Sequence, residues 1–192
     1  MKNIFLPIFT AVILSSCGGV EVDSLASKLS EKELINGFTK VKAQFEVIFN
    51  NPADHKQEDL LPLNDSMALY VNALISKYPK SIQLPEVLCN AGVSSLNSRD
   101  EIRSLKYLTY VVDSFPEHVL VPKSMYFIGR TKEVLSEDAE GAKVAYKLLY
   151  RSFPNTNWAE IAKSSIRQIS NPVILESIDD EDSIDTDTTE KN

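Results

Sequence analysis

The sequence predicts an all-α protein built as a solenoid of helical hairpins. An aromatic–proline pair occurs three times, as Tyr78-Pro79, Phe115-Pro116 and Phe153-Pro154, at spacings of 37 and 38 residues. Apolar residues recur at helical spacing before each pair, and a polar turn follows it. A fixed period of this length is typical of architectures in which each repeat stacks on the next.

The 192-residue chain divides into four segments. We expect residues 1–16 to be a lipoprotein signal peptide and 17–24 a lipidated tether. Residues 25–170 should form the repeat domain, with about seven helices, and 171–192 a disordered acidic tail. The tail holds eight acidic residues and one lysine, so it carries the whole net charge of −7. The repeat domain is therefore nearly neutral, and a nucleic-acid partner is not expected.

The N-terminus has the layout of an export signal. Lys2 supplies a positive charge, residues 4–14 are mainly apolar, and the small residues Ser15 and Ser16 follow. The apolar stretch is shorter than a membrane-spanning helix requires.

The segment Leu14-Ser15-Ser16-Cys17 resembles the lipobox of bacterial lipoproteins. The resemblance implies that Cys17 carries diacylglycerol, and that cleavage before it frees an amine for further acylation. Several acyl chains would hold the protein on a membrane durably. Gly18, where an inner-membrane retention signal would have Asp, implies the outer membrane of the bacterial cell envelope, with its periplasmic face favoured over the cell surface. The alternative is an ordinary signal peptide with a cysteine nearby.

The first helix of the repeat domain is expected over residues 25–50. Its apolar residues follow one helical face at steps of four and three: Leu34, Phe38, Val41, Phe45 and Ile48. Residues 51–64 contain two prolines and no periodicity, so they should form a loop.

The remaining helices follow from the repeat. Helices are expected over residues 66–77 and over the corresponding stretches before Phe115 and Phe153. Each helix must end before the proline that follows it. Pro85 and Pro122 suit the first turn of helices over 85–97 and 122–135. Residues 97–100 and 136–138 form turns that offer Ser and Asp as N-caps. Residues 156–170 should form a helix that caps the array.

Small residues complete the pattern. Gly92 and Gly129 share one column, and Ser104 and Ala142 share another. These columns resemble the small positions of the tetratricopeptide repeat, although Met67 replaces a small residue and the third copy lacks the glycine. The long copies are similar to lipoproteins of outer-membrane assembly and envelope coordination. The resemblance implies a non-enzymatic protein that binds partners in a concave groove.

No catalytic constellation or cofactor motif is present, and no metal-binding spacing occurs. The only expected modification is the acyl lipid on Cys17. Cys89 lies in an apolar run and should be a buried core residue. His55 and His118 fall in a loop and a turn, where solvated side chains are expected.

By repeat register, the groove should include Asn97, Lys123, Tyr126 and Arg130. It should also include Glu86, Cys89 and Val93 on the helix of Asn97, and Glu133 on the helix of Lys123. Tyr126 could instead belong to the core. The expected partners are envelope or outer-membrane proteins, and the oligomeric state stays open. The alternative function is a surface-exposed lipoprotein that binds a glycan or peptide, or a non-catalytic subunit of an envelope enzyme.

Overall fold

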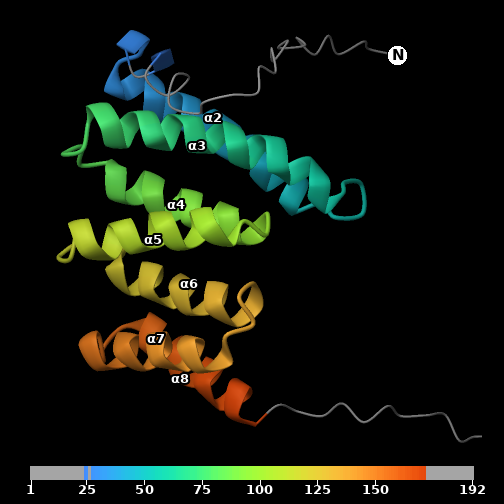
Figure 1. Ribbon diagram of the computed structural model, residues 1–192, viewed down its shortest axis with the longest axis vertical. Coiled ribbons are helices and arrows are strands. Elements are labelled where there is room, and N and C mark those ends of the chain that lie inside the picture. Colours follow the sequence, from blue (N-terminus) through green and yellow to red (C-terminus); the bar gives the residue numbers. More distant parts are fainter. Residues whose placement is uncertain (1–23, 26, 172–192) are drawn as a thin grey trace, which may run out of the picture.

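The computed structural model describes residues 24–171 except residue 26 (Figure 1). These residues form an all-α solenoid of helical hairpins and contain no β-strand. The tetratricopeptide-like fold predicted from the sequence is therefore confirmed. The helices are α2 (Glu31–Phe49), the 3-10 helix η1 (Gln57–Leu60), α3 (Leu61–Lys77), α4 (Leu84–Asn97), α5 (Glu101–Ser114), α6 (Val121–Val134), α7 (Ala139–Ser152) and α8 (Asn157–Ser170).

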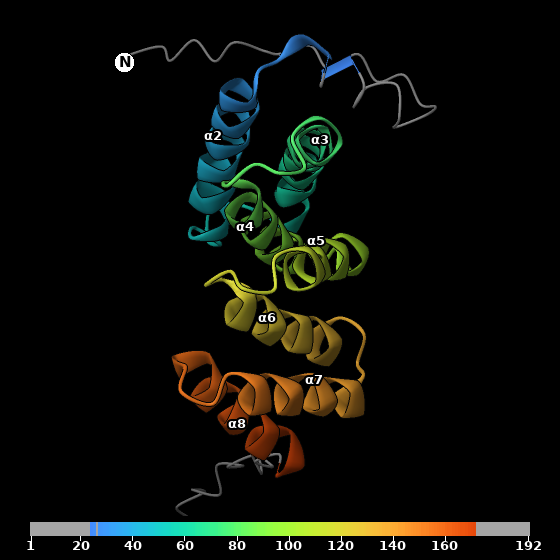
Figure 2. The same cartoon turned by 90° about the vertical axis from the view of Figure 1, so that its left-hand side faces the viewer.

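Three hairpins stack along one axis, and α8 closes the stack (Figure 2). The hairpins are α2–α3, α4–α5 and α6–α7. The backbones of the first helices α2, α4 and α6, together with α8, each approach the next of the set closely, whereas those of α3, α5 and α7 do not. The second helices α3 and α5 meet only through long side chains, such as the ion pair of Arg103 with Asp65. The stack therefore bends toward the first helices, which form its inner face.

The helix predicted over residues 25–50 begins later, at Glu31. Ser30 is the N-cap, and Ser30 and Glu33 form a capping box in which each side chain accepts from the other residue's backbone N–H. Residues 29 and 30 are not helical, so the expected boundary was wrong. The expected apolar stripe is confirmed, because Leu34, Phe38 and Phe45 are buried and the other two members pack against the core.

The loop expected over residues 51–64 is also shorter than predicted. η1 occupies residues 57–60, and α3 begins at Leu61 with Pro62 in its first turn. A proline there loses no hydrogen bond, so it starts the helix instead of marking a loop. Asn64, placed in the loop by the sequence, is a buried residue of α3.

The three aromatic–proline pairs end their helices in one conformation. Tyr78, Phe115 and Phe153 have φ from −129° to −133° and ψ from 54° to 56°. The N–H of each donates to the carbonyl four residues earlier, at 2.8 to 3.1 Å. The carbonyl of each then accepts from the backbone N–H three residues later. The second helix of each hairpin therefore ends in the same way, which keeps the stack regular.

The turns inside the second and third hairpins are equally alike. Asp100 and Asp138 cap α5 and α7 through side chains that accept from the backbone N–H of Arg103 and Gly141, at 3.0 and 2.8 Å. The residue before each cap is left-handed, with φ of 63° at Arg99 and 52° at Glu137. Both features recur one repeat apart, so the hairpin turn is copied with the helices.

Each hairpin closes on a glycine of its first helix. A Cβ placed on Gly92 would lie 2.6 Å from Cγ of Leu108, which is closer than any real contact. A Cβ on Gly129 would run into the ring of Tyr146, and one on Gly37 into the ring of Tyr70. The predicted column of Gly92 and Gly129 therefore extends to Gly37. At each crossing, a large side chain of the second helix lies against bare backbone of the first.

Several polar side chains buried between hairpins are paired with one another. The amide of Asn64 donates to Asp100 at 3.1 Å and accepts from Ser95 at 3.0 Å. The hydroxyls of Ser104 and Thr131, both fully buried, lie 2.8 Å apart. A buried polar group without a hydrogen-bond partner lowers the stability of the fold. These groups are paired only when the hairpins stack in this register, so they favour it over others.

Gly129→Ala should lower the free energy of unfolding by about 1–3 kcal/mol, because Tyr146 is fully buried and its ring has no space to retreat. Alanine would otherwise stabilise a helix by about 1 kcal/mol relative to glycine. Urea denaturation followed by circular dichroism measures the difference. A variant as stable as the parent or more so would show that the crossing is not tight.

Candidate partner-binding groove

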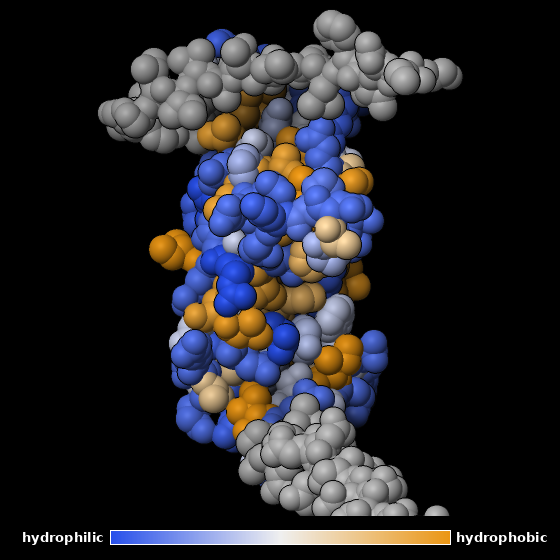
Figure 3. All heavy atoms as spheres, turned by 90° about the vertical axis from the view of Figure 1, so that its right-hand side faces the viewer, coloured by the Kyte–Doolittle hydropathy of each residue, from blue (hydrophilic) through white to orange (hydrophobic). Residues whose placement is uncertain are grey.

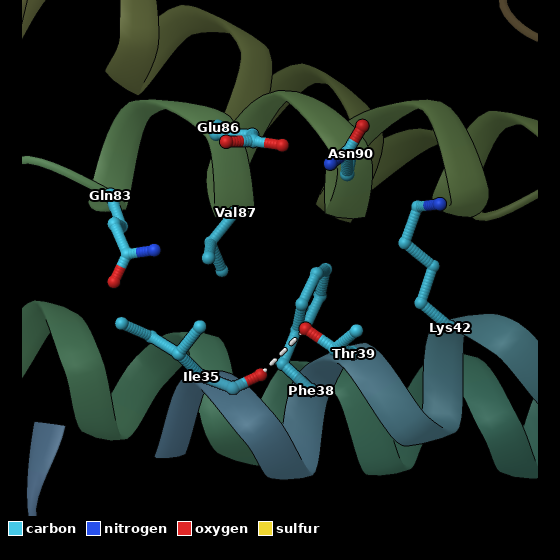
Figure 4. A pocket seen from close by; sticks show the side chains of 8 residues that line it. All are labelled: Ile35, Phe38, Thr39, Lys42, Gln83, Glu86, Val87 and Asn90. Atoms are coloured by element: carbon cyan, nitrogen blue, oxygen red, sulfur yellow. Dashed lines mark hydrogen bonds between the residues drawn. The ribbon is translucent and has the colours of Figure 1, made fainter. Parts of the chain in front are cut away.

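A cavity of about 170 Å³ lies between α2 and α4 on the inner face (Figure 4). Ile35, Phe38, Thr39 and Lys42 of α2 face Gln83, Glu86, Val87 and Asn90 of α4 and its N-cap across it. The hydroxyl of Thr39 donates to the carbonyl of Ile35 at 2.8 Å. The floor is apolar where Phe38 and Val87 meet, and the rim is polar.

A second cavity, of about 250 Å³, continues the first toward α6. Lys42 and Asn90 line both, so the two cavities form one groove along the inner face. The second cavity adds Lys123 of α6, which makes the groove span all three hairpins. Its other lining residues are Phe45, Glu46, Phe49, Asn50, Val93, Ser94 and Asn97.

The groove combines amide groups with a short apolar strip. Asn50, Asn90 and Asn97 each carry a donor and an acceptor. Phe49 stacks on the buried Phe45 with ring centroids 6.2 Å apart and is itself 43% exposed. Lys42 pairs with Glu46, whereas Lys123 has no ion-pair partner among the described residues. Neutral hydrogen-bonding groups therefore dominate. Among the described residues, Glu86 in the first cavity and Lys123 at the α6 end are the lining charges without an ion-pair partner.

The structure brings together two of the four predicted groove residues. Asn97 and Lys123, from α4 and α6, line the second cavity. Tyr126 and Arg130 line neither cavity. Both have partners elsewhere: Tyr126 packs against Trp158 of α8, and Arg130 pairs with Glu133 of its own helix.

Tyr126 belongs to an aromatic cluster at the junction of α6, α7 and α8. Its ring centroid lies 5.3 Å from that of Trp158, 5.5 Å from Tyr146 and 5.3 Å from Phe127. Tyr126 is half-buried and packs against the core. The cluster joins the capping helix to the last hairpin, as expected of an element that covers the end of a solenoid.

Arg130 takes part in a chain of polar contacts beside this cluster. Its guanidinium lies 3.0 Å from the carboxylate of Glu133, and the same carboxylate oxygen accepts from the hydroxyl of Tyr146 at 2.7 Å. Burial, together with the Glu133 carboxylate, raises the pKa of Tyr146, so the hydroxyl stays protonated and donates. Arg130 is thus already paired within the fold.

Cys89 is 1% exposed, which confirms that it is a core residue and corrects its assignment to the groove. The repeat register correctly placed Cys89 on α4, but at this position the helix faces α6 and not the groove. Burial raises the pKa of the Cys89 thiol, which disfavours the reactive thiolate. His55 is exposed, whereas His118 is half-buried and accepts from the N–H of Leu120 at 3.2 Å.

Within residues 24–171, no three His, Cys, Asp or Glu side chains are grouped as a metal site would require. No helix in this described part has the length and apolar character needed to cross a membrane. Cys17 and the acidic tail lie outside the described residues, apart from Asn171.

A larger cavity, of about 580 Å³, lies at the free end of the stack. It is bordered by Gly37 and Val41 of α2, Leu69 and Tyr70 of α3, and Leu25. A preceding hairpin would stack at this place in a longer array. We therefore regard this cavity as the end of the solenoid and not as part of the groove.

Sequence reasoning missed the contribution of α2 to the groove. Lys42 and Phe49 of α2, together with Asn90 of α4, were not among the predicted residues. The one usable signal was the spacing of Phe45 and Phe49, which lie one turn apart although only Phe45 belongs to the predicted apolar stripe. An extra aromatic residue beside a complete stripe indicates a second apolar surface.

Comparison with models of known protein families gives no match. A TPR repeat-containing protein of Treponema pallidum (strain Nichols) is 38% identical over 71 residues. The matched part covers 37% of this chain and 28% of that protein, so the two share only a portion of their lengths. The match agrees with the repeat pattern and with the fold.

Tyr126→Ala should destabilise the protein by about 2 kcal/mol, because it removes the ring that joins α6 to α8. The emission of Trp158, the single tryptophan of the sequence, should shift to the red as α8 loosens. Lys123→Ala should change stability by less than about 0.5 kcal/mol. If Tyr126→Ala left both stability and emission unchanged, the side chain would be free to contact a partner.

Proposed function

We propose that this chain is a lipid-anchored, non-enzymatic scaffold of the bacterial envelope that binds a partner protein along the groove formed by α2, α4 and α6. The continuous groove across three hairpins is the observation that carries the proposal. A helical repeat array of this kind presents an extended concave surface, which suits protein–protein interaction.

The size of the groove favours a peptide over an enclosed small molecule. Pockets for drug-sized ligands measure about 300–1,000 Å³ and bury most of the ligand. Here two smaller cavities, of about 170 and 250 Å³, are joined in a row. Such a row can receive successive side chains of an extended segment.

The lining chemistry favours the same occupant. An extended peptide brings unpaired N–H and C=O groups, and leaving them unpaired on burial would be costly. The amides of Asn50, Asn90 and Asn97 can donate to and accept from such groups. Phe49 and Val93 would contact an apolar side chain, and Lys123 an acidic one.

The lipid on Cys17 would confine the groove to the outer membrane. Confinement raises the effective concentration of the scaffold for partners held on the same membrane. Outer-membrane protein assembly and envelope organisation are the processes we propose, because the long repeats resemble lipoproteins of those systems.

A photo-crosslinking side chain placed at Asn90 should give discrete covalent adducts in living cells, whereas one at Thr109 on α5 should not. The combined change Asn90→Ala, Asn97→Ala and Lys123→Ala should remove adducts formed from a second groove position, Phe49. A matched variant changes Asn72, Thr109 and Lys147 to alanine on the second helices and should keep those adducts.

Equal adducts from Asn90 and Thr109 would contradict the groove as the binding site. So would the absence of adducts from both positions in a protein that circular dichroism shows to be folded. Mass spectrometry of the adducts names the partner. Recovery of envelope proteins would support the scaffold function, whereas crosslinks to glycan alone would support the ligand-binding alternative.

Cys17→Ala should abolish incorporation of an alkyne-tagged fatty acid and leave a larger, uncleaved precursor. The thioether to diacylglycerol forms on the sulfur of Cys17, and alanine has no sulfur. Gel mobility and fluorescent detection of the tag measure both effects. Normal cleavage and labelling in the variant would rule out the lipid anchor.

A further inference from the structure

Two aliphatic side chains project from equivalent turns on one edge of the solenoid. Ile82 is 88% exposed and Val119 is 82% exposed, and each is the third residue after its proline. The turns that carry them connect α3 to α4 and α5 to α6, on the edge that faces the viewer in Figure 2. Neither side chain belongs to the core, so the fold gains nothing from their apolar character.

Exposure alone does not single out this edge. Apolar side chains also reach the surface on the opposite edge, in patches separated by hydrophilic residues (Figure 3). Ile102, at the start of α5 on that opposite edge, is 81% exposed. A second observation is needed to distinguish the two edges.

The position at which the chain reaches α2 provides this distinction. The ammonium group of Lys77, at the end of α3, donates to the carbonyl of Leu29 at 3.1 Å. The residues just before α2 therefore lie beside the α3–α4 turn, on the edge of Ile82. Cys17 lies 13 positions before Ser30, a length of chain that spans at most about 45 Å. A lipid on Cys17 would hold this edge near the bilayer.

We propose that this edge rests on the phospholipid bilayer and that Ile82 and Val119 insert between its headgroups. The inference depends on the lipid anchor proposed above. Lys80, exposed in the first turn, can keep its charge at the phosphate level while the aliphatic side chains go deeper. The equivalent residue of the third repeat is the polar Asn157, so the apolar tips are confined to the turns nearer α2.

Two aliphatic side chains are too few to bind a membrane alone, but they can orient a protein that an anchor already holds there. The first helices α2, α4 and α6 all begin at this edge. Insertion of the tips would therefore make these helices rise from the bilayer and keep the groove clear of the lipid.

The test uses the chain from residue 17 with Cys17→Ser and an N-terminal polyhistidine tag, held on phosphatidylcholine vesicles by a nickel-chelating lipid. An environment-sensitive dye is attached to Ile82→Cys, Val119→Cys or, as the matched control, Ile102→Cys. Cys89 is buried and is not expected to react. Circular dichroism checks that each labelled protein is folded.

Dye emission at positions 82 and 119 should rise at least about twofold and shift to the blue when the protein is tethered, with no change at 102. No rise at 82 and 119, or an equal rise at all three, would overturn the proposed orientation. A rise at 82 and 119 that depends on protein concentration without vesicles would assign the tips to contact between copies. Because the tether is artificial, failure here is separate from failure of Cys17 to be lipidated in cells.

Discussion

The close approach of backbone to side chain inside each hairpin is the constraint on which the rest of the structure depends. Gly37, Gly92 and Gly129 leave space for Tyr70, Leu108 and Tyr146 to lie against the helix axis of their partners. Larger residues would push the paired helices apart and change their crossing angle. Every hairpin has this contact, so its crossing angle is repeated along the stack. The stacking, the curvature and the position of the groove all follow from it.

The turns transmit that geometry from hairpin to hairpin. The aromatic C-caps share one backbone conformation, and the Asp caps share another with a left-handed residue before them. Buried pairs such as Ser104 with Thr131 then select the register between neighbours. Local turn chemistry and long-range packing agree, which is expected of a sequence with one well-defined fold.

The groove is a consequence of the bend of the stack. The backbones of the first helices approach one another, while those of the second helices stay farther apart. Residues from α2, α4 and α6, which lie up to 88 positions apart in the sequence, therefore meet around two connected cavities. The aromatic cluster of Tyr126 and Trp158 ends this surface by joining α8 to the last hairpin. A binding surface and a capped end thus arise from one packing scheme.

The sequence by itself determined the fold class, the period, most helix boundaries and the small residues at the crossings, because these depend on local spacing and turn chemistry. It misplaced the starts of α2 and α3. The capping box at Ser30 was taken as part of a longer helix, and the first-turn Pro62 was taken as part of a longer loop. Only the tertiary structure decided that Asn97 and Lys123 share a cavity, that Tyr126 packs against Trp158, and that Cys89 faces α6. These outcomes depend on the angle at which one hairpin meets the next, and helical periodicity identifies a face without telling which neighbour covers it.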